Sequence, residues 1–208
     1  KADVVGLQEV DRGVKRTQRV DQPAELGKLT GMHAYFMQNH PYQGGEYGNA
    51  ILSRYKILSW ENEDISAHSF ESRGMLHCEI EVPGMAAPVH CINVHLGLTE
   101  AGRKRQLAMI VARVRKMVPD DAPLILAGDF NDWQMRACHY FKDELGLAEV
   151  FETHHGKPAR SYPSILPMFQ LDRIYVRRFN IESAHVHTGN AWHRISDHAA
   201  LTAKLSLA

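Results

Sequence analysis

The sequence predicts a single domain of mixed α/β layering, and three observations lead to this prediction. The chain has 208 residues, a length typical of one domain. Nearly continuous apolar runs at 3–9 and 123–130 are typical of strands that are covered on both faces. Hairpin signals and strand–helix–strand units follow one another irregularly, which excludes a regular doubly wound sheet.

Local signals place the elements along the chain. Asp21 as N-cap, Pro23 in the first turn and Gly31 as the stop define the first helix. Turn residues and alternating apolar residues delimit the strands. In chain order we expect a strand at 3–9, a helix at 22–30, a strand–turn–strand unit at 49–58, a hairpin formed by 73–82 and 89–96, a helix at 100–118, a strand at 123–130, a short helix at 141–151 that stops near Gly146, and strands at 171–176 and 198–207.

The helix expected at 100–118 is amphipathic, and Thr99 is its predicted cap. Its predicted buried stripe consists of Leu107, Ile110, Val111, Val114 and Val118. Its other face is basic, and we expect that face to be solvated. The basic residues are Arg103, Lys104, Arg105, Arg113, Arg115 and Lys116.

The composition limits the classes of protein. The 24 basic and 24 acidic residues balance, whereas proteins that act on long nucleic acids usually carry a basic excess. This balance weighs against a processive or non-specific nuclease. No apolar run reaches the length of a membrane span and no signal peptide is visible, so we expect a monomeric cytoplasmic protein without a transmembrane segment.

The three cysteines are too few for a disulfide framework. Cys78 and Cys91 lie on the two strands of the predicted hairpin. If Val82 faces Val89, these two cysteines are diagonal neighbours, too far apart for an easy disulfide. We therefore interpret them as small buried apolar residues in a reducing compartment.

Polar side chains follow or precede several apolar runs. Glu9, His95 and Asp129 stand at the carboxyl ends of their runs, while Asp172 and the pair Asp197-His198 stand near the amino ends of theirs. If the last two strands run opposite to the first three, all these side chains share one edge. Crowded carboxylates raise one another's pKa unless a cation lies among them. Oxygen ligands favour Mg²⁺ or Mn²⁺, and the imidazoles and Asn131 suit a phosphoester.

Three other motifs have alternative interpretations. Asn49 in a Gly-Asn pair either faces this site or serves a turn. His185 and His187 have a spacing that zinc sites use, but no third ligand is evident, so we interpret them as surface histidines. The apolar segment 164–170 packs on the domain, or its residues Leu166, Met168 and Phe169 contact a lipid or a base.

The order of six motifs resembles the endonuclease/exonuclease/phosphatase superfamily, the DNase I-like enzymes. The motifs are LQEV, GNAILS, NVHL, GDFND, LDRIYV and SDHAAL. The opening segment and the approach SYPS to LDRIYV resemble bacterial YbhP-like metal-dependent hydrolases. The resemblance implies a four-layer α/β/β/α sandwich with two mixed β-sheets. Because the family's first strand, with an Asn that helps hold the metal, has no counterpart here, we expect residues 1–208 to form one N-terminally truncated domain.

The resemblance also implies ligand-binding roles. Glu9 and Asp197 match carboxylates at the metal, which would be Mg²⁺ or Mn²⁺. His95 matches a histidine directed at the scissile phosphate, and Asn131 matches an amide that steadies phosphate and water. Asn49 is a further candidate for substrate contact.

The same resemblance implies the catalytic roles and hence the activity. Asp129 matches the aspartate that orients or deprotonates the attacking water, and His198 matches an acid/base histidine that Asp172 holds in its tautomer. The expected activity is divalent-metal-dependent hydrolysis of a phosphoester, a diester rather than a monoester. A DNA or RNA nuclease, or an inactive binding module of the same fold, are the alternatives. The substrate stays open between nucleic acid, phospholipid and inositol phosphate.

Overall fold

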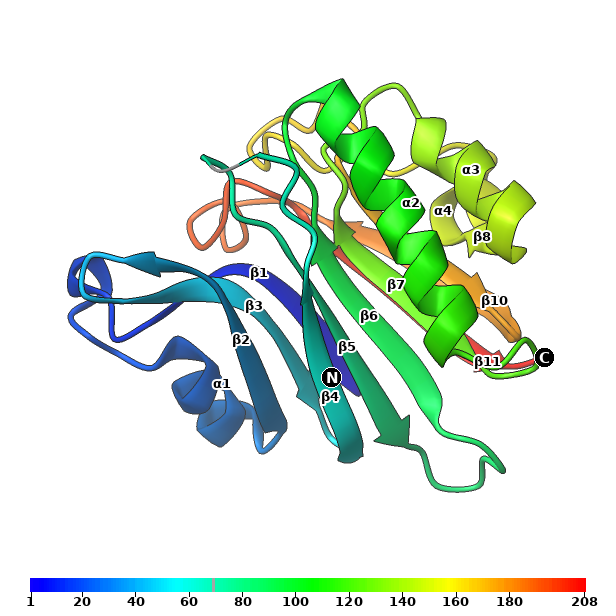
Figure 1. Cartoon of the computed structure of the whole chain (residues 1–208), viewed down its shortest axis with the longest axis horizontal. Helices are drawn as coiled ribbons and strands as arrows, with labels where there is room; N and C mark the ends of the chain where they lie inside the picture. Colours follow the sequence, from blue (N-terminus) through cyan, green and yellow to red (C-terminus); the bar gives the residue numbers. More distant parts are fainter. Residues whose placement is uncertain (69) are drawn as a thin grey trace.

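The computed structural model describes residues 1–68 and 70–208 and has mixed α/β architecture, as the sequence predicts (Figure 1). The strands are β1 (Val4–Arg12), β2 (His33–Tyr42), β3 (Gly45–Ser53), β4 (Lys56–Asp64), β5 (Gly74–Glu81), β6 (Val89–His95), β7 (Leu124–Asp129), β8 (Ala148–Glu149), β9 (Asp172–Arg177), β10 (Phe179–His187) and β11 (Ala200–Leu207). The helices are α1 (Gln22–Thr30), α2 (Glu100–Met117), α3 (Arg136–Leu145) and α4 (Val150–His155), with a 3-10 turn at Lys15–Thr17.

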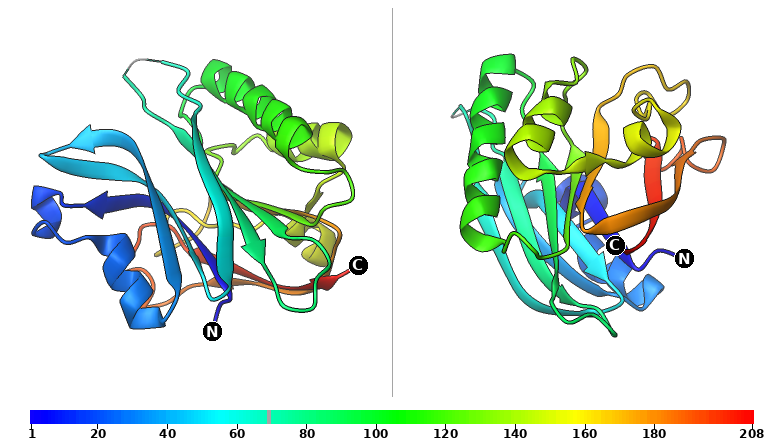
Figure 2. Two further views of the ribbon diagram at one scale, coloured as in Figure 1. Left: turned by 60° about the horizontal axis from the view of Figure 1, so that its bottom comes forward. Right: turned by 90° about the vertical axis from the view of Figure 1, so that its right-hand side faces the viewer.

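The layers form an α/β/β/α sandwich. One sheet has six strands in the order β4-β5-β6-β7-β9-β8, in which β6 and β7 are parallel and the other neighbours are antiparallel. Helices α2 and α3 cover its outer face (Figures 1 and 2). The facing layer consists of two antiparallel sheets, β1-β3-β2 and β10-β11, and α1 packs on the first of them. The expected class is confirmed, but the second sheet is divided into two within the described chain.

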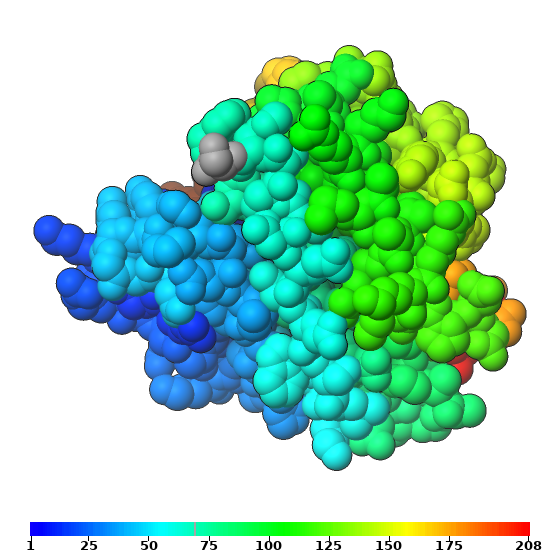
Figure 3. Space-filling view, viewed as in Figure 1, coloured from blue at the N-terminus to red at the C-terminus, as the bar shows by residue number. Residues whose placement is uncertain are grey.

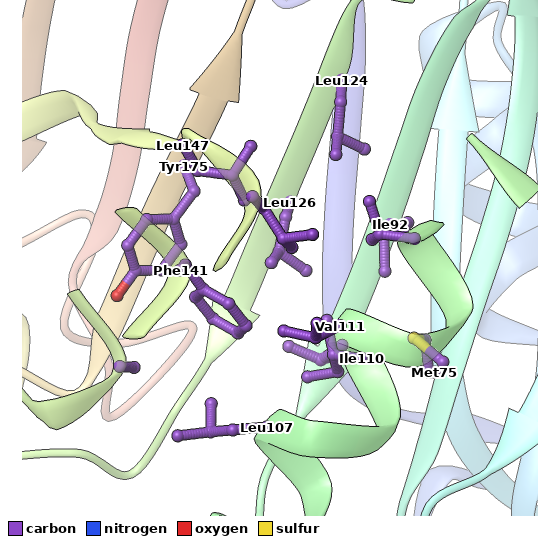
Figure 4. Packing of buried hydrophobic residues seen from close by; sticks show 14 of the residues in the cluster. Met75, Ile92, Leu107, Ile110, Val111, Leu124, Leu126, Phe141, Leu147 and Tyr175 are labelled. Carbon is purple, nitrogen blue, oxygen red and sulfur yellow. The ribbon is translucent and has the colours of Figure 1, made fainter. Parts of the chain in front are cut away.

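The outer core lies between α2, α3 and the six-stranded sheet. Thr99 caps α2 as predicted, since its hydroxyl accepts from the Gly102 amide. The predicted apolar stripe of α2 is buried against this sheet, and Figure 4 shows Leu107 and Ile110 of α2 beside Phe141 and Leu126. In the space-filling view, α2 and α3 form one continuous surface over the sheet (Figure 3).

A polar contact joins the two facing layers. Asn93 on β6 donates its amide to the Leu7 carbonyl of β1 (2.8 Å) and to the Ala50 carbonyl of β3 (3.0 Å), and its oxygen accepts from Gln8 (2.5 Å). Asn93 is buried, so these partners satisfy a side chain that would otherwise be costly in the interior. This contact fixes the position of β1 and β3 against β6.

The hairpin register differs from the prediction. Ile80 pairs with Val89, so Cys78 and Cys91 lie directly opposite each other rather than diagonally. The loop between the strands is longer than assumed, which moves the pairing by two residues. Both cysteines are buried free thiols, as predicted.

Three further details depart from the sequence expectations. The helix expected at 141–151 is α3, which begins earlier and ends before Gly146; the remainder forms β8 and α4. Strand β2 was not expected, because its polar and aromatic residues alternate weakly. On α2, Arg103 is buried rather than solvated, and its guanidinium donates to the carbonyls of Gly97 and Leu98. In the described residues, the helices are all too short or too polar to cross a bilayer.

Candidate functional site

Three polar residues lie at matching positions on three adjacent strands of the large sheet, β6, β7 and β9. His95 ends β6 and pairs with Asp129, which ends the parallel strand β7. Asp129 in turn pairs with Asp172, the first residue of the antiparallel strand β9. Residues at the same register on adjacent strands point to the same face, so all three side chains face the smaller sheets. His95 Nε2 lies 3.5 Å from Asp129 Oδ2.

His198 joins this row from the loop before β11. Its Nδ1 lies 2.7 Å from Asp172 Oδ2, and its ring packs on Tyr162 with 4.9 Å between ring centroids. The Ser161 hydroxyl accepts from the Asp172 amide, and the Ser161 carbonyl accepts from the Ala199 amide. Ser161 therefore holds the chain at Asp172 and next to His198, and Nε2 is the remaining polar atom of the His198 ring.

Asn131 forms a tight turn after β7. Its φ of 48° is left-handed, a conformation that Asn tolerates better than most residues. Its backbone amide donates to Asp129 Oδ1 (2.8 Å), and its side-chain amide donates to the Leu96 carbonyl (2.9 Å). The turn thus orients the Asp129 carboxylate, while one amide hydrogen of Asn131 is already used.

Glu9 reaches the site through a β-bulge. The register of β1 against β3 shifts between Leu7 and Val10, and Glu9 has a φ of 58°. A bulge redirects the side chain of the extra residue. Here Glu9 Oε1 lies 4.0 Å from His95 Nδ1, and 62% of the Glu9 side chain is exposed. The carboxylate therefore borders the site and is open to a ligand.

The surroundings shift the pKa values of His95 and His198 in opposite directions. Burial, together with the nearby cations Arg73 and His198, lowers the pKa of His95 to about 3 and keeps its ring neutral. Burial works in the same direction on His198, but the hydrogen bond and charge of Asp172 outweigh it and raise the pKa of His198 to about 9. Burial and the Asp172 charge raise the pKa of Asp129. A neutral imidazole, an imidazolium and a basic carboxylate therefore lie together.

Two residues near the site were missed in the sequence. Arg73 donates to the Leu96 carbonyl and pairs with Glu71, and its charge acts on both His95 and Asp129. Tyr47 on β3 has a raised pKa, first because it is buried and second because the Glu9 carboxylate is near it. Tyr47 stands at no predicted strand end, so only the pairing of β3 with the bulged strand β1 reveals it.

Two predicted residues stand apart from the row. Asp197 is exposed; its backbone carbonyl accepts from the Ser164 amide, and its charge acts on the neighbouring His198. Asn49 lies within β3 rather than in a turn; it is buried and donates to the Gly74 carbonyl (2.9 Å). His185 and His187 lie on β10, and His187 contacts Thr202.

The site offers few protein ligands to a hard cation, so water would have to supply most of the coordination. Within the ranges 1–68 and 70–208, no three His, Cys, Asp or Glu side chains converge as a preformed metal cluster. Mg²⁺ keeps several waters and commonly binds through one or two carboxylates. The exposed oxygens of Glu9, which lies on the Nδ1 side of the His95 ring while Asp129 lies on the Nε2 side, fit such a hydrated ion.

The comparisons with known proteins agree with this geometry. The sequence profile described as "Endonuclease/Exonuclease/phosphatase family" matches residues 1–198. The chain belongs to this family. The family comprises nucleases and phosphatases, which act on phosphoesters.

Individual relatives support the assignment to the endonuclease/exonuclease/phosphatase family. The chain is 44% identical to "Uncharacterized protein YbhP" of Escherichia coli K12 over 170 residues, which is 82% of this chain and 67% of YbhP. A conserved protein from Enterococcus faecalis has the same fold, with a TM-score of 0.81, 18% identity, and coverage of 99% of this chain and 86% of that one. The human Nocturnin catalytic domain is similar, with a TM-score of 0.79, 19% identity, and coverage of 99% and 81%. The predicted family, the YbhP-like character and the fold class are confirmed.

Proposed function

We propose that this chain hydrolyses phosphodiesters with a divalent cation, Mg²⁺ or Mn²⁺, and that the row from His95 to His198 carries out the reaction. The observation that supports this most is the arrangement of His95, Asp129, Asp172 and His198 at one sheet edge, with opposite protonation tendencies in neighbouring groups. General acid–base catalysis needs such a pair of groups, one that accepts and one that donates a proton.

Asp129 is the group we assign to the attacking water. Its raised pKa makes it a better proton acceptor than an ordinary aspartate, and the Asn131 amide fixes one of its oxygens. The other oxygen faces His95 Nε2. A water held by Asp129 Oδ2 gives up its proton to this carboxylate as its oxygen attacks phosphorus.

His198 and His95 are the groups we assign to the phosphoryl oxygens. His198 is held through Nδ1 by Asp172, so Nε2 donates its hydrogen to a phosphoryl or leaving oxygen. The neutral His95 contributes a hydrogen bond without adding a charge that would hold the product tightly. Asn131, His95 and Asn49 are the proposed substrate contacts, although Asn49 is buried and donates to Gly74.

Glu9 is the proposed principal ligand for the cation, and Asp197 is the proposed second one. Bound there, the cation would polarise the phosphoryl oxygens as a Lewis acid. Glu9→Gln should weaken Mg²⁺ binding by at least about tenfold, because an amide replaces the charged oxygen donor. Calorimetric titration with Mg²⁺ measures this directly, and Glu46→Gln, on the neighbouring strand β3, is the matched control.

The test of the reaction is turnover of bis-p-nitrophenyl phosphate and p-nitrophenyl phosphate with Mg²⁺, with Mn²⁺, and with EDTA. We expect cation-dependent hydrolysis that favours the diester. Asp129→Asn should lower kcat by at least about 10²-fold, because the base is lost while the shape is kept. Asp143→Asn on α3 is the control.

Two results would contradict the proposal. Wild-type rates in the Asp129→Asn variant would remove the proposed base. Cation binding without turnover of any ester would instead identify an inactive binding module of the same fold. Preference for DNA or RNA over small diesters would direct the assignment to a nuclease.

A further inference from the structure

Two loops beside His198 carry a group of exposed apolar side chains, which we call the apolar rim. The rim consists of Ile165, Leu166, Met168, Phe169 and Ile195. Ile165 and Ile195 are 75% and 74% exposed, and Leu166 is 66% exposed. A contiguous group of large exposed apolar side chains is typical of an interaction surface.

The two loops are joined to each other and to the site. The Ser164 amide donates to the Asp197 carbonyl, and the Ser164 hydroxyl donates to the Ser196 carbonyl, both at 2.7 Å. Tyr162, at the start of the first loop, packs on the His198 ring. Figure 2 (right) shows the two loops, gold and orange, projecting on the same side of the molecule. These contacts connect the apolar rim to the loop that carries His198.

The two loop segments that carry the apolar rim contain basic residues and no acidic ones. Residues 157–171 and 188–196 contain no Asp or Glu, although the chain as a whole is neutral. They carry the exposed Arg160 and Arg194. Asp172 follows the first loop and is paired with His198, while the exposed Asp197 follows the second. Apolar side chains with basic neighbours are the combination that anionic lipid surfaces attract.

The chemistry of the apolar rim favours lipid over nucleic acid. Proteins that bind single strands without sequence preference stack bases on aromatic rings. Four of the five rim side chains are aliphatic and Phe169 is aromatic, while the exposed Trp192 of the second loop packs its ring on His187. Aliphatic side chains offer no stacking face, but they enter the acyl boundary of a bilayer readily.

We propose that the apolar rim docks this protein on an anionic phospholipid surface, with the loops at 163–169 and 192–195 entering the headgroup region. Docking in this way places His198 next to the lipid headgroups, whose phosphodiester bonds would be within reach. That last step rests on the proposed function, whereas the docking itself does not.

The experiment is co-sedimentation with vesicles of phosphatidylcholine, with and without phosphatidylglycerol. We expect binding that requires phosphatidylglycerol and weakens with salt. Ile165→Ser with Leu166→Ser should weaken the partition by at least about tenfold, because two apolar side chains no longer enter the bilayer. Leu29→Ser is the matched control, since Leu29 is 81% exposed on α1, away from the rim, and this change should leave binding intact.

Charge variants and a nucleic-acid probe complete the test. Arg160→Gln and Arg194→Gln should each weaken binding about fivefold, the effect of one basic residue near an anionic surface. Asp129→Asn should bind vesicles like the wild type, so a failed reaction is separated from failed docking. Equal binding by the Ile165→Ser, Leu166→Ser variant, or no vesicle binding by the wild type, would overturn the proposal. Rim-dependent binding to a single-stranded oligonucleotide instead of vesicles would overturn it in favour of nucleic acid.

Discussion

A pair of buried histidines under α2 should make the protein sensitive to mild acid. His77 on β5 and His90 on β6 lie 3.0 Å apart between Nε2 and Nδ1, on the face of the sheet that α2 covers. Burial, with a smaller effect of His90, lowers the pKa of His77 to about 4, and burial also lowers the pKa of His90. The charged groups that act on the pair are Glu61, Glu79, Arg113 and Arg177.

The sign and size of the effect follow from proton linkage. In the unfolded chain, His77 binds a proton near pH 6.5, whereas in the folded chain it does so only near pH 4. Between these values the unfolded state holds more protons, so stability falls as the pH falls. At about pH 5 the cost for His77 alone is about 2 kcal/mol, and it approaches about 3 kcal/mol below pH 4. His90 adds to the loss in the same direction.

Urea unfolding at about pH 7.5 and about pH 5 measures this cost. Other groups also titrate, so the double variant His77→Leu, His90→Leu isolates the pair. Replacing both partners with apolar residues is nearly neutral at the higher pH. The variant should lose at least about 2 kcal/mol less than the wild type on acidification, since the His90 contribution is removed as well. The exposed His185→Gln is the control. If the double variant loses as much free energy of unfolding as the wild type, the pair does not titrate as argued.

Two further predictions concern the site and its support. Asp172→Asn should lower kcat by at least about tenfold with a small change in KM, because His198 loses its orienting carboxylate; a pH–rate profile identical to that of the wild type would contradict this. Gly128→Ala should destabilise the protein by more than about 3 kcal/mol, because φ is +142° and the new Cβ would lie 1.9 Å from the Val94 carbonyl oxygen. Gly84→Ala, in an open turn with φ +85°, is the control in a thermal melt and should cost far less.

The strand ends could be predicted from the sequence because a buried strand is a run of apolar residues, and its polar end residue is conspicuous. Thus His95, Asp129 and Asp172 occupy the shared edge that their positions predicted. Contacts between side chains that are far apart in the chain could not be predicted from the sequence. Arg73 opens the strand predicted at 73–82, but its contacts with the Leu96 carbonyl and with Glu71 have no signal in the sequence.

Strand register and β-bulges could not be predicted from the sequence either. The opposition of Cys78 to Cys91 depends on how many residues the intervening loop absorbs, and no residue type reports that number. The bulge at Glu9 has no sequence signal either, since a glutamate with positive φ is uncommon. Sequence reasoning anticipated which polar residues stand at strand ends, but tertiary pairing decided how they face one another.

The contact that Asn93 makes between the layers has a consequence for the candidate cation site. Asn93 lies two residues before His95 on β6, and its partner Leu7 lies two residues before Glu9 on β1. The side-chain amide of Asn93 thus sets the distance between β1 and β6, and with it the separation of Glu9 and His95. The spacing between the strands that carry Glu9 and His95 is therefore set by folding, before any ligand binds. In this respect the candidate site for a cation or phosphate is preorganised.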